Sequence, residues 1–490
     1  MADKKDFIPI DHVLEKNKKY MHDRIGVGTS YDTGYREIEI DNTPLAIYYL
    51  NGLVEDDNVI QLLKKLVSIE EYGKKDKKKD VWKLVEEHLV NHQITVVDTM
   101  DEAVDQMLSG LIIVFINGND KAFIIDVRSY PGRQPEEPDT ERVIRGARDG
   151  FTENIVENTA LMRRRIRDVR LRNEMLRVGE RSKTDVCISY IQDVTNDDLV
   201  KTTKDNIRKI VIDGMTMADK TVEEFLSENK WNPYPLVRFT ERPDVAVDHL
   251  LDGHVILTVD TSPSVIILPT TFFDHMEHAE EFRQTPAVGT FIRWIRIIAV
   301  IASLYLLPLW LLFAMNEDLL PSSLSYIGPE DKGEVPLFMQ ILIAYIGVEF
   351  LRMAAVHTPT PLATAMGLIA AVLIGQIAVD VGLFYPEVIL YVAISNIGNY
   401  VTPSYELGVA NKLVLLFFLI FTAAFGVAGF IASITIHIIY LTSLRSVKTP
   451  YLWPLIPFNF NALLYIVLRV PIPFAEERPT VIHPKNIYKQ

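Results

Sequence analysis

The sequence contains a single cysteine and lacks the short motifs that identify common enzyme classes. With only Cys187 in 490 residues, a disulfide framework within the chain is excluded, and this cysteine is interpreted as a small core residue. A glycine-rich phosphate loop, an H-E-x-x-H helix and a cysteine cluster are all absent from the sequence. His275 and His278 are interpreted as part of a solvated helix face. We therefore predict no enzyme activity, no catalytic residue, no metal site and no cofactor.

The sequence also lacks an excess of positive charge. Its formal net charge is −14 and its pI is about 5.3, which excludes a chain that coats nucleic acid with its whole surface. Charged residues are concentrated in roughly the first 290 positions, and the remainder is mostly apolar. This asymmetry predicts a soluble region followed by a membrane region. The first residues contain no apolar core of a signal peptide, so the soluble region is expected on the cytoplasmic side.

An internal duplication is the clearest feature of the soluble region. AVDQMLSGLIIVFINGNDKAFII (103–125) and AVDHLLDGHVILTVDTSPSVIIL (246–268) share one pattern. Each predicts a short helix that ends at a glycine, followed by an apolar strand, a turn and a second apolar strand. Upstream, AIYYLNGLVEDDNV and CISYIQDVTNDDLV repeat the match, at an offset of about 142 residues throughout. We predict two related α/β subdomains, in residues 1–130, which include an N-terminal extension, and in residues 180–285.

A strongly basic segment separates the two copies. Residues 131–179 are predicted to form a basic helical linker, and the candidate subunit-interface residues in it are Arg163, Arg164, Arg165 and Arg167. Binding of nucleic acid by this segment is disfavoured because aromatic stacking partners for the bases are absent. The segment is therefore interpreted as a solvated or subunit-facing helix, and no nucleic-acid partner is expected.

Long apolar runs follow and predict a transmembrane bundle over 290–444. An uncharged run of about 20 residues spans a bilayer, and the expected spans are 297–315, 336–356, 364–383 and 412–444. Residues 386–403 are apolar but short, so they form either a re-entrant segment or a fifth span. The run 412–444 exceeds a bilayer, and it must tilt, extend past the membrane or kink near Gly426 and Gly429. Flanking arginines place both ends of the bundle inside, which favours four spans, and the tail 445–490 is expected to be cytoplasmic or interfacial.

Polar side chains within the apolar runs are the candidate functional residues. Such groups are costly in a bilayer and face a bundle interior or a water-filled path. The candidates are Glu349, Arg352, Gln376, Asp380, Asn396 and Asn399. Glu349 and Arg352 alternatively neutralise each other one helical turn apart, and the two asparagines alternatively make helix–helix hydrogen bonds. Several polar groups on short segments broken by glycine and proline favour a pore or a transporter over a simple anchor.

Several longer motifs resemble one known family. In chain order they are SYPGRQPEEPDTERVIRGARDGFTENIVENTALMRRRIRDVRLR, GERSKTDV, ERPDVAVDHLLDG, PTTFF, LIGQIAVDVGL, YELGVANKL and SLRSVKTPYLWPLIP. Together they resemble the GerA spore germination protein family over nearly the whole chain. The resemblance implies an oligomeric, multi-pass protein of the spore inner membrane, with two soluble subdomains on the cytoplasmic or core side and other germination membrane proteins as partners.

One motif departs from the family pattern. The family commonly has Phe-Glu-Ile-Leu-Arg-Glu-Ala in the second span, whereas this chain keeps Glu349 and Arg352 but has Met353 in place of the second acid. This departure looks more like the sporulation-operon branch of the family than a nutrient-receptor subunit.

The resemblance and the polar residues together predict a homo-oligomeric cation channel subunit that triggers or amplifies germination. A bundle this thin suits a ring of identical subunits, for example a pentamer, held in the lipid bilayer. A non-conducting scaffold for receptor or channel partners is the alternative, and a small-anion carrier ranks third because Arg352 is the one arginine expected at membrane depth.

Overall fold

The computed structural model divides the chain into two compact units, Met1–Gly132 and Arg133–Gln490, which are described separately. The structure describes residues 8–25, 27, 33–50, 54, 56–73, 80–89, 93–127, 141–166, 168, 170–227, 229–320, 327–328, 335–357, 367 and 375–489.

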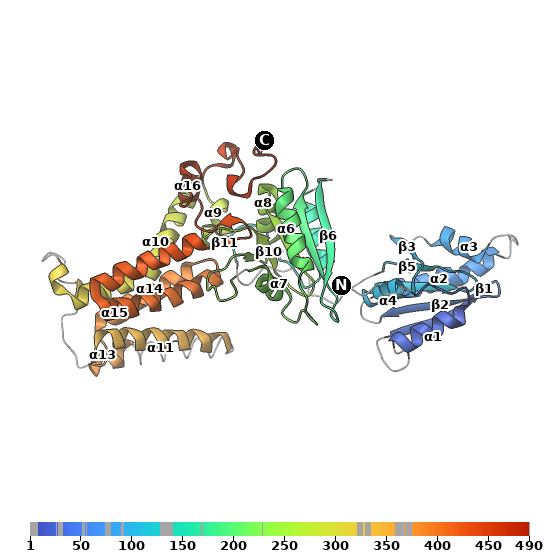
Figure 1. Ribbon diagram of the computed structural model, residues 1–490, viewed down its shortest axis with the longest axis horizontal. Helices are drawn as coiled ribbons and strands as arrows, with labels where there is room; N and C mark the ends of the chain where they lie inside the picture. Colours follow the sequence, from blue (N-terminus) through green and yellow to red (C-terminus); the bar gives the residue numbers. More distant parts are fainter. Residues whose placement is uncertain are drawn as a thin grey trace. The chain divides into compact units, whose positions relative to one another are not determined.

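The first unit is a five-stranded antiparallel sheet covered by helices on both faces (Figure 1). Its strands are ordered β1-β2-β4-β5-β3. In chain order the elements are α1 (Leu14–Ile25), β1 (Thr33–Ile40), β2 (Thr43–Leu50), α2 (Asp56–Gly73), α3 (Val81–His88), β3 (Ile94–Val97), α4 (Met100–Leu108), β4 (Ile112–Ile116) and β5 (Ala122–Ile125). Helices α2 and α3 share one apolar core with the sheet, and α1 and α4 share the other. Both faces are covered, so β4 and β5 are continuously apolar and buried rather than alternating.

The second unit begins with a sheet of the same topology. Its strands are ordered β6-β7-β9-β10-β8, which repeats the first order strand for strand. The elements are α5 (Ile155–Arg165), β6 (Leu171–Val178), β7 (Thr184–Ile191), α6 (Asp197–Arg208), α7 (Ala218–Leu226), β8 (Arg238–Thr240), α8 (Pro243–Asp252), β9 (Val255–Val259) and β10 (Val265–Leu268). Helices α5 and α8 cover one face, and α6 and α7 cover the other. The predicted α/β fold class and its duplication are confirmed.

The basic segment differs from the expected helical linker. Helix α5 ends at Arg165, and Leu171–Val178 form β6, which pairs with β7 along its whole length. Helix α5 packs against α8 and the sheet through Met162 and other apolar side chains. The segment therefore supplies the first helix and the first strand of the second subdomain, as α1 and β1 do in the first.

After the second sheet, the chain forms helices that are long and apolar enough to cross a membrane. Three meet this description among the described residues: Pro286–Met315, Leu337–Ala355 and Tyr405–Ser443. They belong to α10 (Pro286–Met315), α11 (Leu337–His357) and α15 (Tyr405–Ser443), beside the shorter α13 (Ala378–Asp380) and α14 (Pro386–Val401). Half of the expected span 364–383 lies outside the described residues. The bundle is packed around a core to which α10, α11, α14 and α15 contribute.

Helix α15 reverses direction at Gly426. This residue has φ 57° and ψ −134°, which is not helical. The rings of Phe418 and His437 lie 5.4 Å apart between centroids, whereas a straight helix would separate them by about 28 Å. The apolar run is thus two antiparallel arms, 405–425 and 427–443. Of the three alternatives for this run, which were a tilt, an extension past the membrane and a kink near Gly426 and Gly429, the structure has an irregularity at Gly426. It is a reversal and not a bend within one span.

Helix α14 runs along the bundle. Tyr385, just before its start, donates its backbone N–H to Gln340 of α11 at 2.9 Å. Tyr400, near its end, lies beside Lys412, the eighth residue of the first arm of α15. A re-entrant segment would return to the face it entered, whereas α14 begins and ends at opposite ends of the bundle. We call the end that holds Tyr400 and Lys412, next to the second subdomain, the near end.

The C-terminal residues return to the second subdomain. Strands β11 (Arg445–Ser446) and β12 (Thr449–Pro450) follow α15, and Ser446 accepts the backbone N–H of Thr270 at 3.0 Å. Helix α16 (Phe460–Val467) lies against α10, because Trp294 donates its indole N–H to the Val467 carbonyl at 2.9 Å. We call 445–489 the C-terminal strap.

Candidate functional site

The candidate residues Glu349 and Arg352 form an ion cluster with Lys412. The Nε of Arg352 lies 2.9 Å from a carboxylate oxygen of Glu349, and Lys412 binds the other oxygen. All three side chains are at least four-fifths buried. Sequence reasoning identified the first two but missed Lys412, which lies 63 residues away and looks like an ordinary flank of an apolar run.

Aromatic side chains complete this cluster. Arg352 donates to the Tyr405 hydroxyl at 2.9 Å and lies over the same ring at 5.6 Å, and Lys412 lies 5.8 Å from the centre of the Tyr400 ring. The ring faces attract both cations. The cluster carries one net positive charge and joins α11 to the near ends of α14 and α15.

The candidates Asn396 and Asn399 lie on the buried face of α14. Asn396 donates its amide to the Val392 carbonyl at 3.0 Å, and Asn399 donates to the Ser395 carbonyl at 3.4 Å. Their side-chain oxygens have no hydrogen-bond partner among the described residues, although the two residues are only 3% and 6% exposed. Buried amide oxygens without a donor are rare and costly, so they suit a site that receives water or a cation.

Close packing of α14 on α10 positions these amides. A Cβ at Gly398 would lie 2.5 Å from the Ala299 carbonyl oxygen, so a side chain at 398 would force the helices apart. Ser395 donates its hydroxyl to the Ser303 carbonyl of α10 at 2.9 Å. The glycine between the two asparagines thus keeps them at the helix–helix contact.

The remaining intramembrane candidates lie elsewhere. Both side chains are exposed: Gln376 lies two residues before the short helix α13, and Asp380 is its last residue. The structure therefore does not bring Gln376 and Asp380 together with the Glu349 cluster.

A second polar group, which the sequence did not indicate, lies between the arms of α15. The Tyr234 hydroxyl contacts Nε2 of His437 at 2.7 Å and Oδ1 of Asn411 at 3.4 Å, and Tyr305 of α10 lies 3.4 Å from Nδ1 of His437. The group joins both arms to the second subdomain at the near end. Burial raises the pKa of Tyr234, so its hydroxyl stays protonated and available as a donor.

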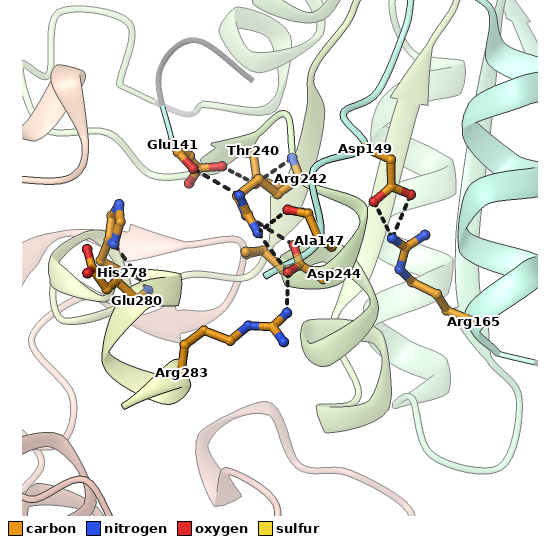
Figure 2. A network of polar contacts seen from close by, with 11 residues as sticks. Glu141, Ala147, Asp149, Arg165, Thr240, Arg242, Asp244, His278, Glu280 and Arg283 are labelled. Carbon is orange, nitrogen blue, oxygen red and sulfur yellow. Dashed lines mark hydrogen bonds and ion pairs between the residues drawn. The ribbon is translucent and has the colours of Figure 1, made fainter. Parts of the chain in front are cut away.

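The candidate interface arginines have partners within their own unit. Arg163 donates to the carbonyls of Asp168 and Leu171 at 2.7 and 2.8 Å, and Arg165 binds Asp149 at 2.6 Å (Figure 2). Arg164 is exposed, and Arg167 lies outside the described residues. Two of the four arginines thus stabilise the second subdomain, and their role between subunits stays a prediction.

Arg242 connects three segments of the second unit. It is 1% exposed and binds Asp244 at 2.8 Å, while its guanidinium also donates to the carbonyls of Glu141 and Ala147. Asp244 accepts a further bond from Arg283 of α9 (Ala279–Arg283) at 2.8 Å. Figure 2 shows this network at the start of α8. The arginines hold the pKa of Asp244 below its usual value despite its burial.

The other side of α9 is fixed to the first membrane helix. Glu281 is fully buried and binds Arg293 at 2.6 Å and also Arg296, both from α10. Arg293 donates as well to the Tyr465 carbonyl of the C-terminal strap at 2.7 Å. Helix α9 therefore joins α8 to α10 through ion pairs on two sides, and we call it the α9 clamp. From the sequence alone, these arginines are predicted only to be a positively charged flank of the first span.

A cavity of about 480 Å³ lies beside the near end. Its lining includes the carboxylates of Glu141, Asp219, Glu241, Glu277 and Glu406, together with Lys220 and Arg238. His275 also lines it, and burial lowers the pKa of His275 to about 3, so it is not the solvated residue that the sequence suggested. Among the described residues, no group of three His, Cys, Asp or Glu side chains is arranged to hold a metal ion.

Comparison with known proteins gives one consistent match. The family described as Bacillus/Clostridium GerA spore germination protein matches residues 19–481. Stage V sporulation protein AF of Bacillus subtilis (strain 168) is 55% identical over 475 residues, which are 97% of this chain and 96% of that protein. Spore germination protein KA of the same organism is 28% identical, over 95% of this chain and 86% of that protein. The solved N-terminal domain of the A subunit of the Bacillus megaterium spore germinant receptor GerK3 is 24% identical, over 55% of this chain and 99% of that domain, with a TM-score of 0.24.

Proposed function

Because this chain belongs to the GerA spore germination protein family, we propose that it is a cation channel subunit of the spore inner membrane. In this proposal identical subunits form a ring, and opening of the ring lets monovalent cations cross and so triggers or amplifies germination. Other germination membrane proteins are the expected partners. The soluble subdomains face the spore core.

The buried amides of α14 are the observation that carries the proposal. Asn396 and Asn399 present two side-chain oxygens without donors, on the face of α14 that packs on α10. Amide oxygens replace the water ligands of an alkali cation, as backbone carbonyls do in ion-selective filters. The acidic cavity at the near end also supports a cation channel, because its carboxylates raise the local concentration of cations.

The Glu349 cluster favours the second candidate, a non-conducting scaffold. A carboxylate that binds Arg352 and Lys412 is neutralised and offers little attraction to a passing cation. In this alternative the cluster only holds α11 in place, and α14 carries no ion.

Single-channel recording separates the two candidates. Purified protein in planar bilayers is compared with Asn396→Ala and with Ile397→Ala, a neighbour that is 60% exposed on the outer face of α14. A channel gives discrete cation-selective openings whose conductance or selectivity changes in Asn396→Ala but not in Ile397→Ala. Silence from folded, oligomeric protein favours the scaffold, and a monomeric mass in mild detergent would count against the ring itself.

A further inference from the structure

Trp231 is almost fully exposed, although it lies on an ordered loop beside a membrane helix. The residue is 94% exposed, and its backbone N–H binds the Asn229 side chain at 3.2 Å. The next residue, Asn232, fixes the loop by donating to the Tyr234 carbonyl at 2.7 Å. The loop therefore presents nearly the whole indole to its surroundings, and the location of the loop indicates what those surroundings are.

A hydrogen bond places this loop at the edge of the membrane. The hydroxyl of Tyr440, in the last turn of α15, donates to Asn232 at 2.7 Å, and α15 ends three residues later at Ser443. The end of an apolar span lies where hydrocarbon gives way to headgroups. Trp231, one residue from Asn232, is therefore at headgroup depth, where tryptophan is enriched in membrane proteins.

Basic side chains surround the same place. Lys230, Arg445 and Lys448 line one cavity of about 310 Å³, and all three are exposed. Within the described part of the chain, none of them forms an ion pair. Glu223 also lines this cavity, but Lys220 binds it, and Glu224 is the remaining acid. The surface thus carries excess positive charge directly beside the bilayer.

We propose that Lys230, Trp231, Arg445 and Lys448 form a docking surface for anionic phospholipid headgroups. We call these four residues the Trp231 surface. The indole inserts among the headgroups while the three cations bind lipid phosphates, a combination that attracts anionic leaflets. The second subdomain then rests on the membrane instead of standing above it, so its position is coupled to the lipid surface as well as to α15.

Fluorescence quenching from the lipid tests this proposal in the full-length protein. The one native cysteine, Cys187, is buried, so a fluorophore can be attached at Trp231→Cys in nanodiscs that contain a quencher in the lipid headgroup region. The matched control is Val211→Cys, which is 87% exposed and lies at the opposite end of the same sheet. There the backbone N–H of Glu180, just after β6, donates to the Ile212 carbonyl at 2.8 Å. We expect several-fold stronger lipid quenching at 231 than at 211.

Lipid composition tests the role of charge. Quenching at 231 should increase when phosphatidylglycerol replaces part of the phosphatidylcholine, and Lys230→Gln with Lys448→Gln should remove most of that increase. Equal quenching at 231 and 211 would overturn the proposal. A label at 231 that is shielded from both lipid and aqueous quenchers would overturn it too, because a protein partner would then cover the surface.

Discussion

Arg293 on the first membrane helix and Glu281 on the α9 clamp form a fully buried ion pair at 2.6 Å. Glu281 also binds Arg296, so one carboxylate serves two guanidinium groups. This contact joins α9 to the first membrane helix, alongside the Tyr234–His437 contact that also joins the second subdomain to the bundle.

Glu281→Gln should destabilise the protein strongly. The change removes the carboxylate that binds both guanidinium groups and leaves Glu277, 3.7 Å from Arg293, as the remaining ion-pair partner. Breaking a buried pair in this way costs about 3–5 kcal/mol. We expect a clear drop in the thermal unfolding midpoint in detergent, measured on the full chain. Glu280→Gln, at the more exposed neighbouring position, is the control and should stay within about 0.5 kcal/mol. An unchanged midpoint for Glu281→Gln would show that the buried pair does not stabilise the native state.

A double-mutant cycle should reveal coupling between Glu349 and Lys412. Glu349→Gln leaves Lys412 and Arg352 without a carboxylate, whereas Lys412→Met leaves Glu349 bound to Arg352 alone. In the Glu349→Gln background Lys412 has already lost its partner, so Lys412→Met should cost less there than in the wild type. The two effects should therefore be non-additive by about 0.5–3 kcal/mol in unfolding free energy. Strict additivity would mean that the Glu349–Lys412 pair does not help to hold α11 to α15.

Gly426→Ala should destabilise the α15 reversal through the backbone. No atom lies within 4 Å of the position that a Cβ would occupy, so steric contact adds nothing. The φ of 57° with ψ of −134° is unfavourable for a residue with a side chain, at a cost of about 1–3 kcal/mol. Gly375→Ala is the matched control, since its site is equally open and no left-handed φ is found there. Similar midpoints for both variants would contradict the strained reversal.

The reversal also predicts the sidedness of labelling. If 405–425 and 427–443 each cross the bilayer, a cysteine at Phe425, which is 65% exposed, lies on the opposite side from one at Arg445. In sealed, uniformly oriented vesicles, a membrane-impermeant maleimide should label Phe425→Cys and Arg445→Cys from opposite sides. The buried native Cys187 should give little background. Labelling of both from the same side would refute two crossings.

The stability of the second subdomain should fall on acidification, in part through His275. Burial lowers its pKa to about 3, whereas an unfolded histidine titrates near 6.5. Below pH 6.5 the unfolded chain binds a proton that the folded chain does not, so stability is complete above 6.5 and is lost as the pH falls toward 3. Through this one group, the free energy of unfolding should fall by about 2 kcal/mol between pH 7 and pH 5. His275→Phe should show a correspondingly smaller shift of the unfolding midpoint, while His12→Phe, at an exposed position, should follow the wild type.

Elements that depend on a local pattern of residues can be predicted from the sequence. The duplicated hairpins follow from apolar runs with glycine and turn residues between them, and Asn396 and Asn399 are conspicuous as amides within an apolar run. The ion clusters could not be predicted in the same way. Lys412 reaches Glu349 only because α15 and α11 meet at the near end, and Arg293 meets Glu281 only because α9 lies across α10. A glycine in a long apolar run indicates an irregularity at Gly426, but the reversal depends on what the two arms pack against.

The C-terminal strap has a consequence for the order in which the molecule is assembled. Val447 packs onto the second subdomain's core, and Lys485 donates its backbone N–H to the Val194 carbonyl at 2.8 Å. These contacts belong to a soluble subdomain, yet they form only after every membrane helix has been synthesised. The packing of the second subdomain is therefore completed last, after insertion into the bilayer, although the five strands of its sheet, which end at Leu268, precede the membrane helices. The first unit is free to fold as soon as it leaves the ribosome. If insertion failed, the second subdomain would lack its contacts with the C-terminal strap and would be exposed to proteolysis. Degradation of a chain with a misinserted membrane region could therefore begin in its soluble region.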